Sequence, residues 1–154
     1  MNAVSAEDDA IRVLHVDDKY RWSKLVQKYL EKIDDDITVR GEQNPETALD
    51  RLAAESIDCV ISDYEMPRLD GIEFLRRVRS DYPNLPFVLF TGGGSEELAS
   101  EATTAGATAY VKKGGPDVYQ LLANQVKRSV AHRRSERRAQ VANDQYLTKH
   151  RQLA

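Results

Sequence analysis

Short apolar runs bounded by polar residues recur along most of this chain. Four of them are nearly continuous in apolar side chains, many of which are β-branched or aromatic, and a fifth is shorter and more polar. Continuous runs of this length are typical of strands buried on both faces of a parallel sheet, whereas the more polar run suits an edge. The predicted strands are residues 11–16, 37–40, 58–62, 86–91 and 109–113.

Apolar positions recur at helical spacing between these runs. The predicted helices are residues 20–33, a segment from Pro45 after the capping residue Asn44, a segment marked by Ile72 to Val78 that stops before Pro83, a segment from Ser95 and a segment from near Pro116. Strands that alternate with helices through short loops imply an α/β fold with a parallel sheet. Right-handed crossovers and an edge position for the second strand favour a flavodoxin-like (βα)5 three-layer sandwich, with a five-stranded parallel sheet of order 2-1-3-4-5.

The composition fits one domain with an appendage. The chain has 154 residues, of which 41% are hydrophobic, and this is enough for a single core. Its net charge of −3 is unevenly distributed, because residues 124–154 hold eight Lys or Arg and two acids, a net of +6, which leaves −9 for residues 1–123. The predicted division is a flexible leader at 1–9, a globular domain at 10–128 and a basic helical linker or tail at 129–154.

The chain is expected to be cytoplasmic. Cys59 is its single cysteine and lies inside an apolar run, so we interpret it as a packing residue and expect no disulfide framework. Neither a secretory leader nor an apolar run of about 18 residues is found, so membrane insertion is not expected.

Polar side chains follow four of the predicted strands, whose carboxyl ends meet at one edge of the sheet. They are Asp17, Asp18, Asp63, Thr91 and either Lys112 or Lys113. Three crowded carboxylates need a counter-charge, and their hard oxygens suit Mg²⁺. An aspartate beside a metal, a lysine and a hydroxyl is equipped to attack phosphorus and to form an aspartyl phosphate.

Four motifs of the chain resemble those of response regulator receiver domains in two-component signalling. They are Val16-Asp17-Asp18, Ser62-Asp63-Tyr64-Glu65-Met66-Pro67 with Asp70-Gly71, Phe90-Thr91-Gly92, and Ala109-Tyr110-Val111-Lys112-Lys113. Each motif is weak alone, but together and in this order they make residues 10–128 similar to a receiver, in particular to those of halophilic archaea. The strand order given above rests in part on this resemblance, because a receiver is a standard example of that topology.

The resemblance implies the residues of a phosphorylation and metal site. Asp63 matches the phosphoacceptor of the family. Asp17 and Asp18 match the acidic pair that binds Mg²⁺ together with Asp63, and Asp18 is expected to be the more direct ligand. Glu65 is expected to offer its backbone carbonyl to the same ion.

The resemblance also implies the residues of a switch. Thr91 and Lys113 match the hydroxyl and the ammonium that bind the phosphoryl group, and Tyr110 matches the aromatic residue that swings inward with Thr91. The spacing from Tyr110 favours Lys113 over Lys112, and strand alternation sends these two lysines to opposite faces. Gly114 departs from the family pattern, which often has a proline there.

The implied function is that of a phosphoprotein in a phosphorelay, accepting a phosphoryl group from a histidine kinase. Three glycines at 92–94 would let the following loop rearrange at low strain, so that the change reaches the surface of the fourth helix, fifth strand and fifth helix. Partners are then a histidine kinase and a downstream protein or fused effector domain. Such a chain is not an enzyme beyond slow self-dephosphorylation. Nucleic-acid binding is not expected, and a homodimer is left open.

Three other interpretations stay open. An aspartate-nucleophile phosphohydrolase would place a second aspartate two residues after the nucleophile, where this chain has Glu65. A flavodoxin-like nucleotide or flavin binder is disfavoured, because a ring of acids repels phosphate in the absence of a metal. The chain could also be a receiver module cut from a longer sensor histidine kinase.

The basic segment at 131–141 consists of strong helix formers with almost no apolar stripe. It is predicted to extend the last helix as a solvated linker. Clustered arginines also bind nucleic-acid phosphates, but no recognition module fits in this length. A coiled coil is weakened by Arg133 and Arg137, at positions where a seam needs leucine.

Overall fold

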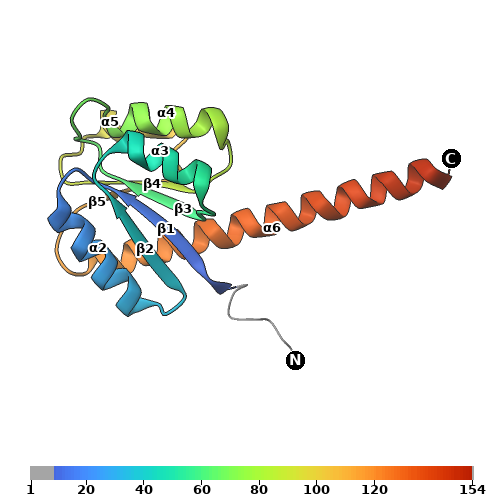
Figure 1. Cartoon of the computed structure of the whole chain (residues 1–154), viewed down its shortest axis with the longest axis horizontal. Helices are drawn as coiled ribbons and strands as arrows, with labels where there is room; N and C mark the ends of the chain where they lie inside the picture. Colours follow the sequence, from blue (N-terminus) through green and yellow to red (C-terminus); the bar gives the residue numbers. More distant parts are fainter. Residues whose placement is uncertain (1–8, 154) are drawn as a thin grey trace.

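The five apolar runs form one parallel sheet (Figure 1). The structure is a computed structural model that describes residues 9–153. The strands are β1 (Ile11–Val16), β2 (Ile37–Glu42), β3 (Cys59–Ser62), β4 (Phe87–Thr91) and β5 (Ala109–Lys112). They pair in the order β2-β1-β3-β4-β5, with Ile37 beside Ile11 and Cys59 beside Val13. The predicted strand order is therefore confirmed, and β2 is the edge strand that its polar sequence suggested.

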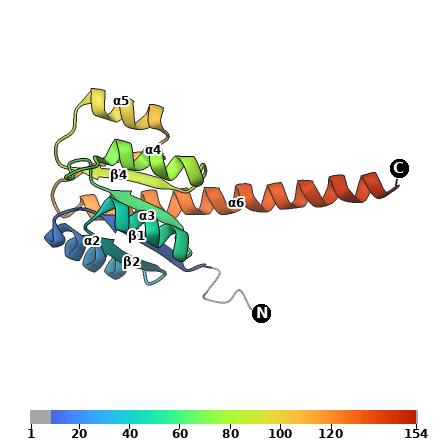
Figure 2. The ribbon, with the colours of Figure 1, turned by 45° about the horizontal axis from the view of Figure 1, so that its top comes forward.

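Helices cover both faces of this sheet. One face carries α2 (Tyr20–Ile33) and α6 (Val118–Leu153), and the other carries α3 (Pro45–Ala54), α4 (Gly71–Asp81) and α5 (Glu96–Ala105). Figure 1 shows the two helical layers on either side of the strands, and Figure 2 shows α4 and α5 stacked over β4. The three-layer flavodoxin-like sandwich predicted from the sequence is confirmed.

Side-chain caps fix where three of these helices begin. Asn44, Asp70 and Ser95 each accept hydrogen bonds from backbone amides of the first turn that follows them. Such caps satisfy amides that have no partner within the helix. Helix α5 ends at Gly106, whose φ of 104° lies in the left-handed region where glycine has no steric cost.

Strand alternation divides the core between the two faces of the sheet. Val13 and Cys59 face the side of α2 and α6, while Leu14 and Val60 face α3, α4 and α5. All four are buried. Burial raises the pKa of the Cys59 thiol well above its ordinary value, and the charge of Asp58 adds to this effect. Cys59 therefore packs as a small apolar residue, as the sequence indicated.

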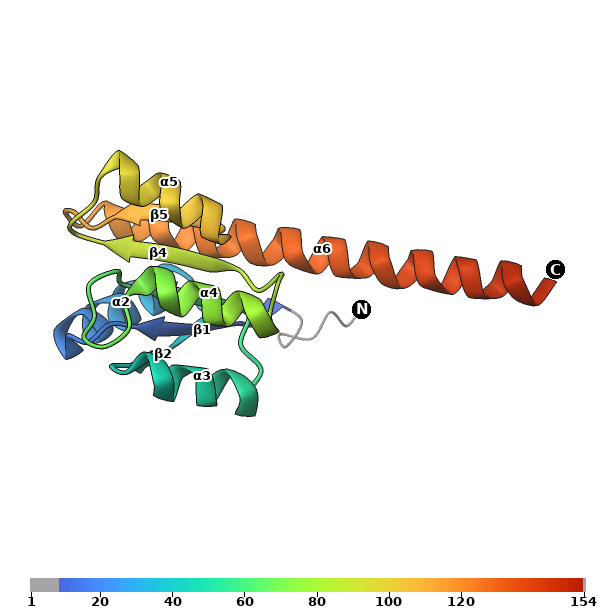
Figure 3. The same cartoon turned by 90° about the horizontal axis from the view of Figure 1, so that it is seen from above.

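Helix α6 continues as one 36-residue element far beyond the sheet (Figures 1, 2 and 3). At 1.5 Å per residue it is about 54 Å long. Val130 is its last buried side chain among those the structure describes, and Arg134 donates a 2.6 Å hydrogen bond to the carbonyl of Ala10. The packed part thus reaches slightly past the predicted boundary at residue 128. The predicted leader, apart from Asp9, lies outside the described residues.

No helix in the described part of the chain is both long enough and apolar enough to cross a membrane.

Candidate functional site

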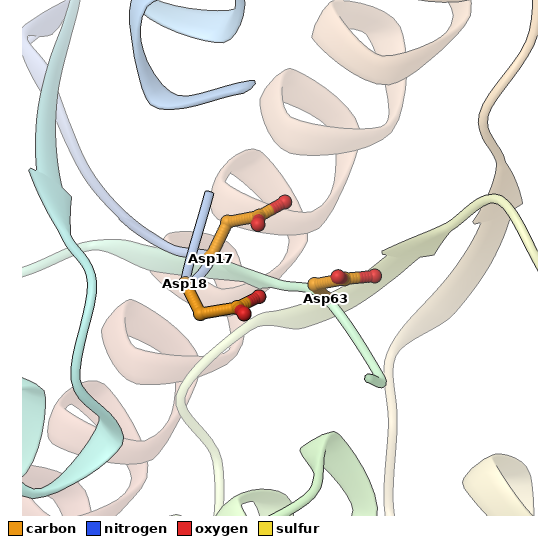
Figure 4. A group of neighbouring side chains, drawn as sticks. All are labelled: Asp17, Asp18 and Asp63. Carbon is orange, nitrogen blue, oxygen red and sulfur yellow. The ribbon is translucent and has the colours of Figure 1, made fainter. Parts of the chain in front are cut away.

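Strand register brings three carboxylates together at the carboxyl edge of the sheet. Val16 pairs with Ser62, so Asp17 and Asp63 leave the ends of two neighbouring strands, and the amide of Asp63 donates to the carbonyl of Val16 at 2.9 Å. One oxygen from each of Asp17, Asp18 and Asp63 lies within 4.8 Å of the others, and the three side chains extend toward the same side (Figure 4). Asp17 is fully buried and Asp63 is 4% exposed.

Lys113 supplies a positive charge to this acidic cluster of Asp17, Asp18 and Asp63. Its Nζ lies 2.9 Å from Oδ2 of Asp17 and 3.5 Å from Oδ1 of Asp63, and its side chain is only 7% exposed. The amide of Lys113 donates to the carbonyl of Thr91 at 2.9 Å, which ties the end of β5 to the end of β4. Lys112 is exposed. Of the two candidate lysines, the structure therefore brings Lys113 to the site.

The donor set of the cluster suits a divalent cation. Three carboxylates and one ammonium leave two uncompensated negative charges if all four groups are ionised. Oδ1 of Asp18 is buried and has no hydrogen-bond partner among the described atoms. By contrast, the two oxygens of Asp17 accept from Nζ of Lys113 and from the amide of Lys19. A buried carboxylate oxygen without a partner among other hard oxygens fits Mg²⁺, and Asp18 and Asp63 are the residues best placed to hold it.

An open pocket of about 430 Å³ adjoins the cluster on the side of Asp18. Its wall includes Asp70, Lys19 and the β3–α4 loop, residues 64–67. Glu65, the residue expected to offer its carbonyl, lies in this loop with its side chain exposed. Asp18 is the member of the cluster that lines this pocket.

The two expected switch residues lie on the α5 side of the site. Thr91 is buried at the end of β4, next to Lys112 in register. Tyr110 packs against the core under α4 and α5, and its hydroxyl is buried at the backbone of Gly94 without a hydrogen-bond partner among the described atoms. The structure thus places Thr91 beside the cluster and Tyr110 under the loop that follows β4.

Two further residues adjoin Lys113 on the α2 side. Its Nζ lies 4.2 Å from the ring centre of Trp22 in the first turn of α2, a contact that the sequence did not indicate. His15 is fully buried, and neither ring nitrogen has a hydrogen-bond partner among the described atoms. Burial, and secondarily the charge of Lys113, lower the pKa of His15 from 6.5 to about 3. His15 is thus a neutral core residue.

Comparison with known proteins decides the family. The family described as "Response regulator receiver domain" matches residues 13–123, which is more than half of the chain. The chain belongs to this family. A solved receiver domain of an HD domain-containing protein from Pseudomonas fluorescens Pf-5 is 27% identical, with a TM-score of 0.75, over 90% of this chain and 97% of that one. The chemotaxis response regulator CheY4 of Vibrio cholerae is 28% identical, with a TM-score of 0.68, over 76% and 98%.

Curated relatives of this receiver are longer proteins. The transcriptional regulatory protein FixJ of Bradyrhizobium diazoefficiens is 43% identical over 65 residues, which are 42% of this chain and 32% of FixJ. A protein-glutamate methylesterase/protein-glutamine glutaminase of Bdellovibrio bacteriovorus is 38% identical over 114 residues, 73% of this chain and 32% of that protein. The receiver thus spans about a third of these relatives. The expected similarity to receivers of halophilic archaea is not supported, because these relatives are bacterial.

Proposed function

We propose that this receiver accepts a phosphoryl group on Asp63 from the phosphohistidine of a histidine kinase. The observation that carries the proposal is the position of the Asp63 carboxylate, which lies 3.5 Å from Nζ of Lys113 and beside two further aspartates. Such a site combines a nucleophile, a positive charge for the incoming oxygens and carboxylates for a cation. The chemistry matches the expectation for a member of this family.

In the transfer step a carboxylate oxygen of Asp63 attacks phosphorus. The new O–P bond forms as the N–P bond to the imidazole breaks, and the released imidazole nitrogen takes a proton from water. Lys113 stabilises the charge on the phosphoryl oxygens, and the Thr91 hydroxyl binds one of them once the β4–α5 loop adjusts. Asp18 and Asp63, with Asp17 and the carbonyl of Glu65, would hold Mg²⁺, which would supply positive charge to offset that of the incoming group.

A phosphohydrolase with its own substrate is the weaker candidate. It needs an acid/base aspartate two residues after the nucleophile, and Glu65 stands there with its side chain exposed at the rim of the pocket. Relatives named as methylesterases do not favour it, since the match covers about a third of such proteins. We infer a phosphoacceptor that at most loses its own phosphoryl group slowly.

We infer that the output is a change in partner contacts. The added phosphoryl carries about −1.5 to −2 charges and three acceptor oxygens, which attract Lys113 and Thr91. Tyr110 would report the movement of Thr91 to the surface of α5, β5 and α6. The recipient is a downstream protein or a further domain of a longer chain, such as a regulator or a sensor kinase in the cytoplasm. The basic part of α6, residues 129–153, serves as the helical linker.

The test uses Trp22 fluorescence with Mg²⁺ and then beryllofluoride, which stands in for the phosphoryl group. Because the ring of Trp22 contacts Lys113, a saturable change that needs Mg²⁺ is expected in the wild type. Asp63→Asn should abolish the beryllofluoride response, and intact-mass measurement after incubation with acetyl phosphate should show one added phosphoryl group in the wild type only. An unmodified wild type, or modification of Asp63→Asn to the same extent, would overturn the proposal.

A further inference from the structure

We propose that Trp22 is a positioning residue for Lys113, whose ammonium its ring holds in place between Asp17 and Asp63. The inference rests on the proposed phosphoacceptor role of Asp63. It assigns to the first turn of α2, which includes Trp22, a part in the chemistry of the site.

The contact has the geometry of a cation–π interaction. Nζ of Lys113 lies 4.2 Å from the centre of the Trp22 ring, well inside the distance of about 6 Å at which such contacts act. Tryptophan has the most attractive face of the aromatic residues, and attraction grows when the cation is shielded from water. The Lys113 side chain is 7% exposed, so shielding is nearly complete.

Lysine needs such a support because its ammonium ends a flexible four-carbon stem. The two ion pairs of Lys113 are unequal, at 2.9 Å to Asp17 and 3.5 Å to Asp63. Without a third contact, the ammonium could settle on Asp17 alone and leave the phosphoacceptor. The ring of Trp22 supplies that third contact at 4.2 Å, and the ring of Phe90 lies further away, with its centre 5.8 Å from Nζ.

Trp22 is itself tied to Asp17 through the backbone. Oδ1 of Asp17 accepts from the amide of Lys19 at 2.9 Å, and the carbonyl of Lys19 accepts from the amide of Trp22 at 3.0 Å. The other oxygen of Asp17 accepts from Nζ of Lys113. These contacts therefore form a closed network that links Asp17, Lys19, Trp22 and Lys113. A shift of the α2 start moves the ring and the carboxylate together.

Packing also fixes the plane of the ring. Trp22 meets Phe90 edge to face, with ring centres 6.2 Å apart and planes at 89°. Phe90 is fully buried in β4, so it forms a rigid stop. Phe90 in turn contacts Tyr119 of α6, with ring centres 6.3 Å apart, and Tyr119 therefore offers a control in the same core.

The first experiment compares variants of the full chain by their rate of phosphorylation with acetyl phosphate and Mg²⁺. Intact-mass measurement over time gives this rate. Trp22→Leu keeps an apolar side chain but removes the aromatic face, so the maximal rate should fall about tenfold. Trp22→Phe should recover most of it. Tyr119→Leu removes an aromatic ring from the same core and should leave the rate within about twofold of the wild type. Equal losses in Trp22→Leu, Trp22→Phe and Tyr119→Leu would show packing alone and overturn the proposal.

The second experiment keeps the volume of the ring and changes only its electrostatics. Trp22 is the only tryptophan of the chain, so growth with fluorinated tryptophans labels this position alone. Fluorine withdraws charge from the ring face. The ζ-nitrogen NMR signal of Lys113 should shift, and the maximal rate should fall, in step with the number of fluorines. If neither the NMR signal of Lys113 nor the maximal rate changed with fluorination, the proposal would be overturned, even if Trp22→Leu failed to fold.

The two proposals fail in different ways. If Asp63 is not the phosphoacceptor, no variant is phosphorylated in a manner that Asp63→Asn abolishes, and the comparison of rates has no basis. If Asp63 is the phosphoacceptor but Trp22 only packs, the wild type reacts and fluorination has no effect.

Discussion

The hydroxyl of Tyr110 is buried directly beneath the backbone of Gly94 and has no hydrogen-bond partner among the described atoms. A methyl group placed on Gly94 would overlap this hydroxyl. The glycine is therefore required by close approach rather than by an unusual backbone angle, since Gly106 is the one described glycine with positive φ. The loop after β4 and the side chain of Tyr110 must move together.

Gly94→Ala is predicted to force Tyr110 out of its present position. The overlap should lower the free energy of unfolding by about 1–3 kcal/mol. Because the hydroxyl is the nearest atom, adding Tyr110→Phe should recover about 1 kcal/mol of that loss. Urea denaturation of both single variants and the double variant measures this coupling. Strictly additive effects would show that the two residues do not interact.

Tyr110→Phe alone is expected to keep or raise the stability, since it removes a buried hydroxyl that makes no hydrogen bond.

Asp18→Asn is predicted to separate metal binding from stability. Removing one carboxylate from a crowded cluster should raise the free energy of unfolding in EDTA by about 1 kcal/mol. The same change should remove most of the stabilisation that Mg²⁺ gives the wild type, because Asp18 holds a buried oxygen without a partner. Thermal denaturation with and without Mg²⁺ measures both effects. Asp50→Asn, at an exposed position of α3, is the matched control and should change neither.

Because His15 is buried in its neutral form, we expect the free energy of unfolding to fall in mild acid. The unfolded chain takes up a proton at His15 near pH 6.5, whereas the folded pKa of about 3 keeps this residue neutral. The unfolded state therefore binds more protons as the pH falls from 6.5 toward 3, and the folded state loses up to about 1.4 kcal/mol per pH unit in that window.

The measurement is chemical denaturation in EDTA between pH 7 and 5, above the range where ordinary carboxylates titrate. His15→Leu should remove most of the slope, and His132→Gln, on the exposed part of α6, controls for the loss of a histidine. A slope equal in wild type and His15→Leu would contradict the prediction.

Arg134→Gln is predicted to loosen the join between α6 and the start of the sheet. Arg134 donates to the carbonyl of Ala10 and lies 3.4 Å from Asp58, which in turn accepts from the amide of Arg12 at 2.8 Å. The change should cost about 1 kcal/mol and speed hydrogen exchange at the amide of Arg12. Arg137→Gln, at an exposed position one turn further along, should leave that exchange rate unchanged.

The fold followed from local signals that needed no knowledge of side-chain contacts. Apolar runs such as residues 86–91 predicted buried strands, and Asn44 before Pro45 marked the start of a helix. The edge of the sheet where Asp17 and Asp63 meet follows from parallel topology alone. These features depend on period and composition, which are visible in the sequence.

Contacts across the site were beyond sequence reasoning. The spacing of Trp22 with the next turns of its helix is that of any core residue, and only the docking of α2 on the sheet brings its ring to Lys113. Gly94 was interpreted as part of a flexible loop, whereas its contact with Tyr110 depends on how that loop folds back over β5. The link from Arg134 to Asp58 depends on the direction in which α6 leaves the domain. Each is a consequence of tertiary packing, which overrides local pattern.

Val130 divides the long helix α6 into a short arm, residues 118–130, which packs on the sheet, and a long arm, residues 131–153, which extends beyond it. The short arm is pinned by the core up to Val130, and the long arm reaches about 35 Å further at 1.5 Å per residue. A tilt of about 5° at the pivot would displace the far end by about 3 Å, as follows from that length. A rearrangement too small to alter the outline of the domain would thus become a displacement of atomic size at the tip of α6.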